Sequence, residues 1–178
     1  MSLIKVHEMR FLAILMLLFS LIHLEGKEVI FESKSIKDWG GAVRKTTCKN
    51  GIFDTNKDLF VLVSKQKFPI KQGKTYRLIG DFKLKPYAPF GNIYFGFIAL
   101  NNQGKAIRRV YAGESPYNDR VAPGNNQQVR NFWLTFEGVV PSKKFSFPKG
   151  TAAVQIIIHQ FENYIVDMNF KNIKLIEE

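Results

Sequence analysis

The sequence of 178 residues contains a single cysteine, Cys48. A lone cysteine excludes an intramolecular disulfide, and it has no partner at the spacing of a metal-binding motif. The fold must therefore be stabilised by packing rather than by covalent or metal cross-links. A chain of this length can bury a core large enough for that.

Acidic residues are scarce relative to basic ones. The 26 Lys and Arg against 15 Asp and Glu give a formal net charge of +11. A positive field of this size favours anionic partners, such as nucleic acid, acidic lipid or acidic polysaccharide. The alternative is that the charge only keeps the protein soluble.

The sequence has little hydrophobic clustering apart from one short apolar run, residues 11–22, which two basic residues precede and Gly26 follows. This is the layout of a secretory signal peptide, and the run is too short for a comfortable membrane span. We expect residues 1–26 to be the signal peptide and residues 27–178 to form one secreted or periplasmic domain, without a stable membrane span after cleavage. An uncleaved N-terminal anchor is the alternative. Cleavage leaves the net charge unchanged, and export argues against a nucleic-acid partner.

No convincing amphipathic helix follows residue 26, whereas strand-like alternation is frequent. The clearest case is residues 71–85, where a turn at Gly73 leads into alternating apolar and polar side chains. The apolar members are Tyr76, Leu78, Phe82 and Leu84. This segment is predicted to be a half-buried strand.

Turn signals divide the rest of the chain into further strand candidates. We expect strands at residues 28–32, 42–48, 59–64, 92–100, 106–112, 131–140, 151–160 and 164–176, with turns at 38–41 and 49–58. Residues 113–130 are rich in Pro, Gly and Asn and predict a long loop of the kind that is functional or disordered. The pattern indicates an all-β protein, a two-sheet antiparallel β-sandwich.

Four motifs, in this order along the chain, resemble the jelly-roll carbohydrate-binding modules of families 4, 9 and 22. They are Trp39 after an N-terminal strand, FPIKQGKTY at residues 68–76, WLTFEG at 133–138 and FPKG at 147–150. The resemblance covers nearly all of residues 27–178. It implies a galactose-binding-like β-sandwich (jelly roll) whose partner is a polysaccharide or oligosaccharide.

The closing strand departs from the pattern of these modules. The resemblance implies an acidic residue, which often helps to hold a structural calcium, where this chain has Lys171. An ammonium group cannot ligate a cation that requires oxygen donors. We therefore expect no calcium at the usual position and no other cofactor or metal, with Asp167 and Glu32 as the alternative source of carboxylates.

Sugar recognition requires flat apolar surfaces for ring C–H groups, planar polar groups for hydroxyls and, for acidic sugars, cationic forks. Residues of these types would share one sheet face if the strands at 92–100, 106–112, 131–140 and 151–160 are neighbours. Others lie in the long loop, where arginine suits bidentate binding of carboxylate or sulfate. The candidate carbohydrate-binding residues are Tyr94, Arg109, Tyr111, Tyr117, Arg120, Trp133, Gln155 and His159. The alternatives are a core position for Trp133 and a structural role for His159.

Catalytic signatures are also missing. The sequence has no Gly-x-Ser-x-Gly, His-Glu-x-x-His, P-loop or Gly-x-Gly-x-x-Gly motif. The leading hypothesis is a secreted, non-catalytic protein that binds an acidic or sulfated polysaccharide. One alternative is a small jelly-roll polysaccharide lyase acting on uronate polymers, with His159 and Tyr111 as base and acid and Arg109 neutralising the uronate. The other is a structural or adhesive secreted protein.

Overall fold

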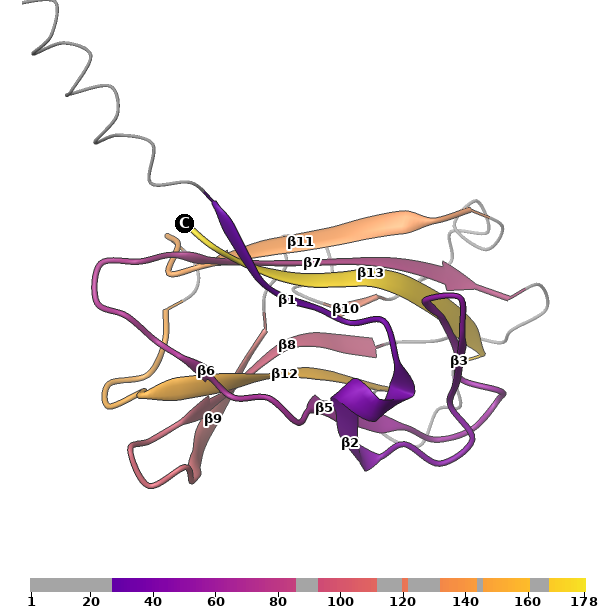
Figure 1. Cartoon of the computed structure of the whole chain (residues 1–178), viewed down its shortest axis with the longest axis horizontal. Coiled ribbons are helices and arrows are strands. Elements are labelled where there is room, and N and C mark those ends of the chain that lie inside the picture. The colour runs from indigo at the N-terminus through magenta and orange to yellow at the C-terminus, as the bar shows by residue number, and fades with distance from the viewer. Residues whose placement is uncertain (1–26, 86–92, 112–119, 122–131, 144–145, 161–166) are drawn as a thin grey trace, which may run out of the picture.

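The structure, a computed structural model, describes residues 27–85, 93–111, 120–121, 132–143, 146–160 and 167–178. In this part of the chain two antiparallel sheets, here called sheet A and sheet B, stack face to face (Figure 1). The predicted all-β sandwich is therefore confirmed. The expected signal peptide lies outside the described residues. Within them, no helix is both long and apolar enough to cross a membrane.

Sheet A has the strand order β11-β7-β13-β4-β3, and β1 also pairs with β13. Its strands are β1 (Glu28–Glu32), β3 (Thr47–Lys49), β4 (Ile52–Asp54), β7 (Tyr76–Leu84), β11 (Leu134–Val140) and β13 (Met168–Glu177). Because β7 occupies one edge of β13 along its whole length, β1 and β4 share the other edge. The last strand of the chain is thus the centre of this sheet.

Sheet B has the order β10-β8-β12-β5-β2, with β6 also on β12 and β9 also on β8. Its strands are β2 (Trp39–Ala42), β5 (Val61–Ser64), β6 (Phe68–Pro69), β8 (Ile93–Leu100), β9 (Ala106–Tyr111), β10 (Arg120–Val121) and β12 (Ala153–Gln160). The apolar strand β8 pairs with β12 along its whole length. Its other edge is shared by β9 and β10. The strand β8 is therefore central in sheet B.

The core between the sheets is rich in aromatic rings. The predicted inward set of β7 is at most 2% exposed, and the rings of Phe53 and Phe170 stack with centroids 4.7 Å apart. Gly80 takes the remaining inward position of β7, where a Cβ atom would lie only 2.6 Å from Ile173 Cδ1. Sheet A can therefore pack closely there because residue 80 has no side chain.

The N-terminal region differs from the sequence prediction. Residues 38–41, expected to be a turn, contain the end of a 3₁₀ helix (Ile36–Asp38) and most of β2. The expected strand at 42–48 is divided: residue 42 ends β2, residues 47–48 begin β3, and a turn lies between them. The strand β4 lies within the expected connection at 49–58. Gly41 explains the first error: it has a φ of +81° and a Cβ would lie 2.4 Å from the Val61 carbonyl oxygen. The glycines allow a close approach of β2 to β5 rather than ending a strand.

Candidate functional site

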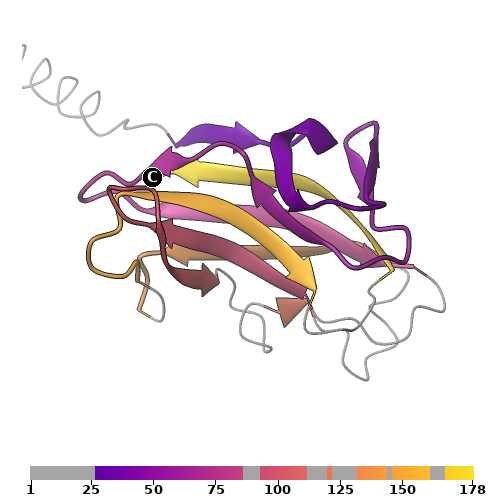
Figure 2. The same cartoon turned by 90° about the horizontal axis from the view of Figure 1, so that it is seen from below.

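The outer face of sheet B collects most of the predicted site residues. Alternate residues of β8 and β12, such as Phe97 and Ile156, are buried in the core, so the residues between them face outward. Figure 2 views the molecule from this side, with β8 and β12 lying side by side. We call the outward-facing positions of β2, β5, β8, β9, β10 and β12 the sheet B face.

The strand register brings six of the eight candidates into three successive rows. Tyr94 of β8 is opposite His159 of β12, Gly96 is opposite Ile157 in the next outward row, and Ile98 is opposite Gln155 in the row after that. On the other edge of β8, the register places Arg120 opposite Tyr94, Tyr111 opposite Gly96 and Arg109 opposite Ile98. Neighbouring strands lie about 4.8 Å apart. The six positions therefore lie together on one face. Alternation predicted this for five of them, whereas Arg120 was expected in the loop at 113–130 and instead belongs to the short strand β10.

The aromatic pair of Tyr94 and His159 lies at one end of this patch. Their rings are stacked, with centroids 4.7 Å apart and an angle of 24° between the planes. His159 is buried, with 9% of its surface exposed, whereas Tyr94 is half-buried. The ring of Tyr94, which His159 holds in place, is a flat surface of the kind that receives the C–H face of a sugar ring.

The side chain of Gln155, on the same strand as His159, is fixed by a hydrogen bond to β5. Its Nε2 donates to the carbonyl oxygen of Ser64 at 2.6 Å, and Ser64 Oγ in turn accepts from the backbone N–H of Ile156 at 2.9 Å. The amide therefore has a defined orientation over the boundary between β12 and β5. A fixed planar amide is suited to hydrogen bonding with sugar hydroxyls.

The expectation that Trp133 shares this face is wrong. Trp133 directly precedes β11, which pairs with β7 in sheet A, so the residue belongs to the opposite sheet. The ring is half-buried and lies under the ammonium group of Lys171, whose Nζ is 4.5 Å from the ring centroid. Alternation along a strand predicts its two faces but cannot tell which sheet the strand joins. Tyr117 lies outside the described residues.

Two lysines at the rim of the sheet B face were not identified from the sequence. Lys65 follows β5, and its Cγ would be 3.7 Å from a Cβ on Gly40, at an outward position of β2. The Nζ of Lys67 would be 3.1 Å from a Cβ on Gly104, in the turn between β8 and β9. The alternation of Lys65 and Lys67 in the sequence Ser-Lys-Gln-Lys at residues 64–67 could have indicated this. Both extend the basic character of the face beyond the arginine positions.

The carboxylates proposed to rebuild a calcium site are held by lysines instead. Glu32 pairs with Lys34 at 2.9 Å and with Lys174 at 3.3 Å, and these ammonium groups lower the pKa of Glu32. Asp167 pairs with Lys85 at 3.1 Å. Glu32 is opposite Lys174 on β13, so it is seven residues, roughly 20 Å, from Asp167. These two carboxylates cannot share one cation.

Comparison with known proteins gives structural matches only. No protein-family model and no curated protein matches the sequence. Among solved structures, the chain is similar to the CBM22-1-GH10 modules of Clostridium thermocellum endo-1,4-β-D-xylanase 10B, complexed with xylohexaose, at 12% identity and a TM-score of 0.52. The match covers 85% of this chain but only 28% of that one.

Two smaller solved domains are also similar. One is the CBM22-1 xylan-binding domain of Paenibacillus barcinonensis Xyn10C, at 11% identity, with 85% of this chain and 96% of that one covered and a TM-score of 0.45. The other is a CBM4 structure, at 14% identity, with coverages of 81% and 84% and a TM-score of 0.47. The described chain is thus an antiparallel two-sheet β-sandwich that resembles, in its fold, the carbohydrate-binding modules of family 22.

Proposed function

We propose that the protein is a non-catalytic carbohydrate-binding protein that holds an acidic or sulfated polysaccharide on the sheet B face. The observation that supports this most is the register of β8, β9, β10 and β12. It groups two aromatic rings, an anchored amide and the positions of Tyr111, Arg109 and Arg120 in three successive rows. These are the residue types that a charged sugar polymer requires.

Each part of the patch has a distinct task in this proposal. The half-buried ring of Tyr94, held in place by its stacking against the buried His159, receives a sugar ring, and the amide of Gln155 hydrogen-bonds to its hydroxyls. The guanidinium groups of Arg109 and Arg120 bind carboxylate or sulfate in a bidentate manner, for which arginine is better suited than lysine. Lys65 and Lys67 add long-range attraction at the rim.

The fold of the matched xylanase modules, which were solved with xylohexaose, supports a polysaccharide ligand. The net charge of +11 supports an acidic one. The positions of Arg109 and Arg120 on the same patch would let two of these positive charges contact the acidic groups of the ligand.

The uronate lyase gains no support from the site. A general base must reach the proton that it removes from the substrate, and His159 is buried and stacked against Tyr94. We therefore propose binding without cleavage. Incubation with pectate or alginate should give no rise in ultraviolet absorbance from unsaturated sugar ends.

We further propose that residues 1–26 are a signal peptide and that the protein works outside the cytoplasm. The first strand, β1, begins at Glu28, two residues beyond the proposed cleavage position. N-terminal sequencing of the exported protein should find a start at or close to Lys27. Retention of the apolar run would contradict this proposal.

Affinity electrophoresis tests the binding proposal. Gels that contain alginate, pectin or carrageenan should retard the wild-type protein more than gels that contain neutral glucan. The double variant Arg109→Ala with Arg120→Ala should lose most of this retardation. The control Lys143→Ala with Lys149→Ala removes the same charge from exposed positions outside the patch. This control should be retarded as strongly as wild type. Equal retardation of the two double variants would refute the assigned site.

A further inference from the structure

The outer face of sheet A contains a hollow of about 390 Å³, on the opposite side of the sandwich from the sheet B face. Its lining comes from β3, β4, the turn between them and β13. The lining residues are Thr47, Lys49, Asn50, Ile52, Asp54 and Asn169. The volume is within the range of small-ligand sites. The neighbours of the lining residues on β4 and β13, Phe53 and Phe170, are buried in the core, so the hollow opens outward.

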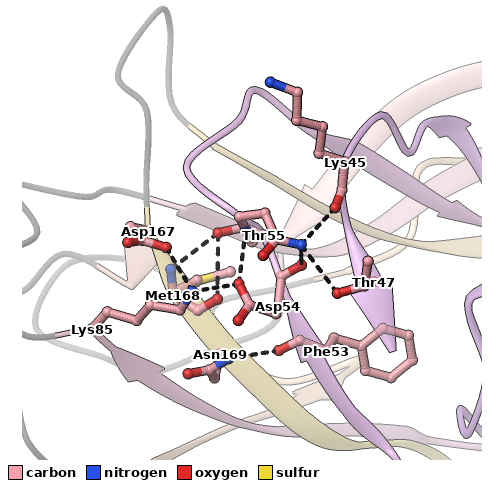
Figure 3. A network of polar contacts seen from close by, with 10 residues as sticks. Lys45, Thr47, Phe53, Asp54, Thr55, Lys85, Asp167, Met168 and Asn169 are labelled. Carbon is pink, nitrogen blue, oxygen red and sulfur yellow. Dashed lines mark hydrogen bonds and ion pairs between the residues drawn. The ribbon is translucent and has the colours of Figure 1, made fainter. Parts of the chain in front are cut away.

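Hydrogen bonds hold the polar lining in place (Figure 3). Asn56 donates from Nδ2 to Thr47 Oγ1 at 3.1 Å and to the Lys45 carbonyl oxygen at 2.7 Å. Asn169 Nδ2 donates to the Phe53 carbonyl oxygen at 3.3 Å. Two of the lining side chains are thus held: Thr47 of β3 by the turn that follows β4, and Asn169 of β13 by the backbone of β4. A ligand would meet groups that are already ordered, which lowers the entropy cost of binding.

The charge of the hollow is compensated. Lys85 lies between two carboxylates, with its Nζ 2.6 Å from Asp54 Oδ1 and 3.1 Å from Asp167 Oδ1 (Figure 3). Asp54 Oδ1 also accepts from the backbone N–H of Asn56 at 2.8 Å. Because Asp54 already has a cationic partner, its carboxylate serves as a hydrogen-bond acceptor rather than as a ligand for a metal ion.

The remaining chemistry fits a neutral sugar. Ile52 is 41% exposed and gives the hollow an apolar surface. The other lining residues supply a hydroxyl, two amides, an ammonium and a carboxylate, so that both donors and acceptors accompany the apolar side chain. A pyranose has the same arrangement, with C–H faces between hydroxyls. We propose that this hollow is a second carbohydrate-binding site, specific for a neutral sugar unit.

The same face continues from the hollow toward Trp133. Asn169 of β13 is opposite Asp54 on one side and Lys83 on the other. Beyond them, Asp81 accepts from Thr135 Oγ1 at 2.7 Å and from Asn172 Nδ2 at 2.6 Å. From β3 to β11 there are four strand spacings, about 19 Å. An oligosaccharide that crosses the strands would therefore extend from the hollow to the ring of Trp133.

This site goes beyond the proposed function and does not depend on it. Two sites on opposite faces of one sandwich cannot contact the same short segment of a polymer. The protein would then bind an acidic chain on one side and a neutral chain on the other, and so link two polysaccharides.

Amide chemical shifts test the second site directly. ¹⁵N-labelled protein is titrated to millimolar concentration with xylohexaose, cellohexaose and mannohexaose, while the backbone signals of Asn50, Gly51 and Ile52 are followed. At least one hexaose should shift these signals in a saturable manner. If none of the three does so, the proposal is wrong.

Two variants separate a site from a structural effect. Asn50→Gly with Ile52→Thr removes the amide and the apolar surface while keeping the positive φ of residue 50 and a β-branched side chain; its affinity for the hexaose should fall at least tenfold. Val29→Thr makes a similar change at an exposed position of β1 and should bind like wild type. Unchanged affinity in the double variant would overturn the site. Arg109→Ala with Arg120→Ala should leave hexaose binding in the hollow intact. Failure of the sheet B proposal can therefore be told apart from failure of this one.

Discussion

At the scale of single residues, Gly80 determines how closely β7 approaches the middle of β13, at Ile173. The chain of β13 contains a bulge between Lys171 and Lys174, where Asn172 has a φ of +53°. The bulge directs Ile173 into the core, where it is completely buried. A Cβ on residue 80 would be 2.6 Å from Ile173 Cδ1 and 2.9 Å from Phe82 Cε2.

Gly80→Ala is therefore expected to lower the free energy of unfolding by about 1–3 kcal/mol through overpacking. Ile173→Val, which removes Cδ1, should cost less in the Gly80→Ala background than in wild type. Urea denaturation of the four proteins in this double-mutant cycle measures the coupling. Gly40→Ala is the control, because its added Cβ meets no atom closer than 3.7 Å. Additive effects of the two changes would contradict the proposed contact.

The sequence predicted residues well wherever strict alternation was visible. It assigned the inward side chains of β7 correctly and anticipated the turn at Gly73, which has a positive φ. Gly80 lies in the same strand, but an isolated glycine contains no information about its partner. The close contact depends on Ile173, which is 93 positions later in the chain and is turned inward by a bulge.

At the scale of elements, Lys85 joins the end of β7 to β4 and to the start of β13 (Figure 3). Burial, the largest single effect, opposes its charge, but the hydrogen bond to Asp54 and the ion pair with Asp167 outweigh burial and raise its pKa. Asp54 behaves correspondingly: burial opposes its charge, and Lys85 and Asn56 together lower its pKa. The ammonium group thus holds two carboxylates from different strands.

Lys85→Met should destabilise the protein at pH 7 by about 2 kcal/mol, less than the 3–5 kcal/mol for breaking a fully buried pair, because Asp54 is partly exposed. The folded pKa of Asp54 lies below its unfolded value, so its contribution is present above the unfolded pKa and is lost as pH falls through the folded pKa. The difference between variant and wild type should therefore shrink on acidification. Thermal unfolding between pH 7 and pH 3 measures it.

Lys83→Met is the matched control for this prediction. Lys83 is also half-buried, two residues earlier in β7 and on the same side of the strand. Its removal eliminates one positive charge but leaves the contacts of Lys85 intact. A loss of stability as large as that of Lys85→Met would show that net charge, rather than the ion pair, is responsible.

The long strands were predictable as elements, whereas their sheet membership was not. The segments that became β7, β8 and β12 show clear patterns over eight or nine residues. The strands β2 and β4 have four residues or fewer and form by pairing with β5 and β13, which local sequence cannot reveal. The error on Trp133 has the same cause, because the strand pattern was correct and the choice between the two sheets was not.

At the scale of the whole molecule, ion pairs connect distant parts of the chain. Glu178 binds Arg77 through Nε at 2.7 Å and Nη2 at 3.2 Å and also pairs with Lys27 at 3.1 Å. Arg77 in turn contacts Glu137 on β11. The hydrogen bond from Arg77 is the main reason that the pKa of Glu178 is lowered. These contacts connect β1, β7, β11 and β13 at one end of sheet A.

Glu178→Gln should therefore reduce stability at neutral pH, by no more than about 1 kcal/mol because the pair is partly solvated. The folded pKa of Glu178 is depressed, so its stabilisation is present above the unfolded pKa and disappears as pH falls through the folded value. Variant and wild type should become equally stable at a pH below the folded pKa of Glu178. A difference that persists there would indicate lost packing rather than lost charge.

Because of the net charge of +11, salt should change the ligand affinity of one proposed face and not of the other. An acidic oligosaccharide on the sheet B face is attracted by the whole molecule and by its arginines, and the Debye length falls from about 10 Å at 0.1 M salt to about 3 Å at 1 M. Its affinity should therefore fall by about tenfold or more over this range. A neutral hexaose in the hollow of sheet A has no charge to screen, so its affinity should stay constant.

Calorimetric titrations with oligogalacturonate and with the neutral hexaose, at both salt concentrations, test this contrast. Equal loss of both affinities would mean that salt alters the protein itself, since no screening applies to a neutral ligand. An acidic ligand insensitive to salt would contradict electrostatic recognition and would place its affinity in the stacked rings of Tyr94 and His159. Loss confined to the acidic ligand is the result that two chemically distinct faces require.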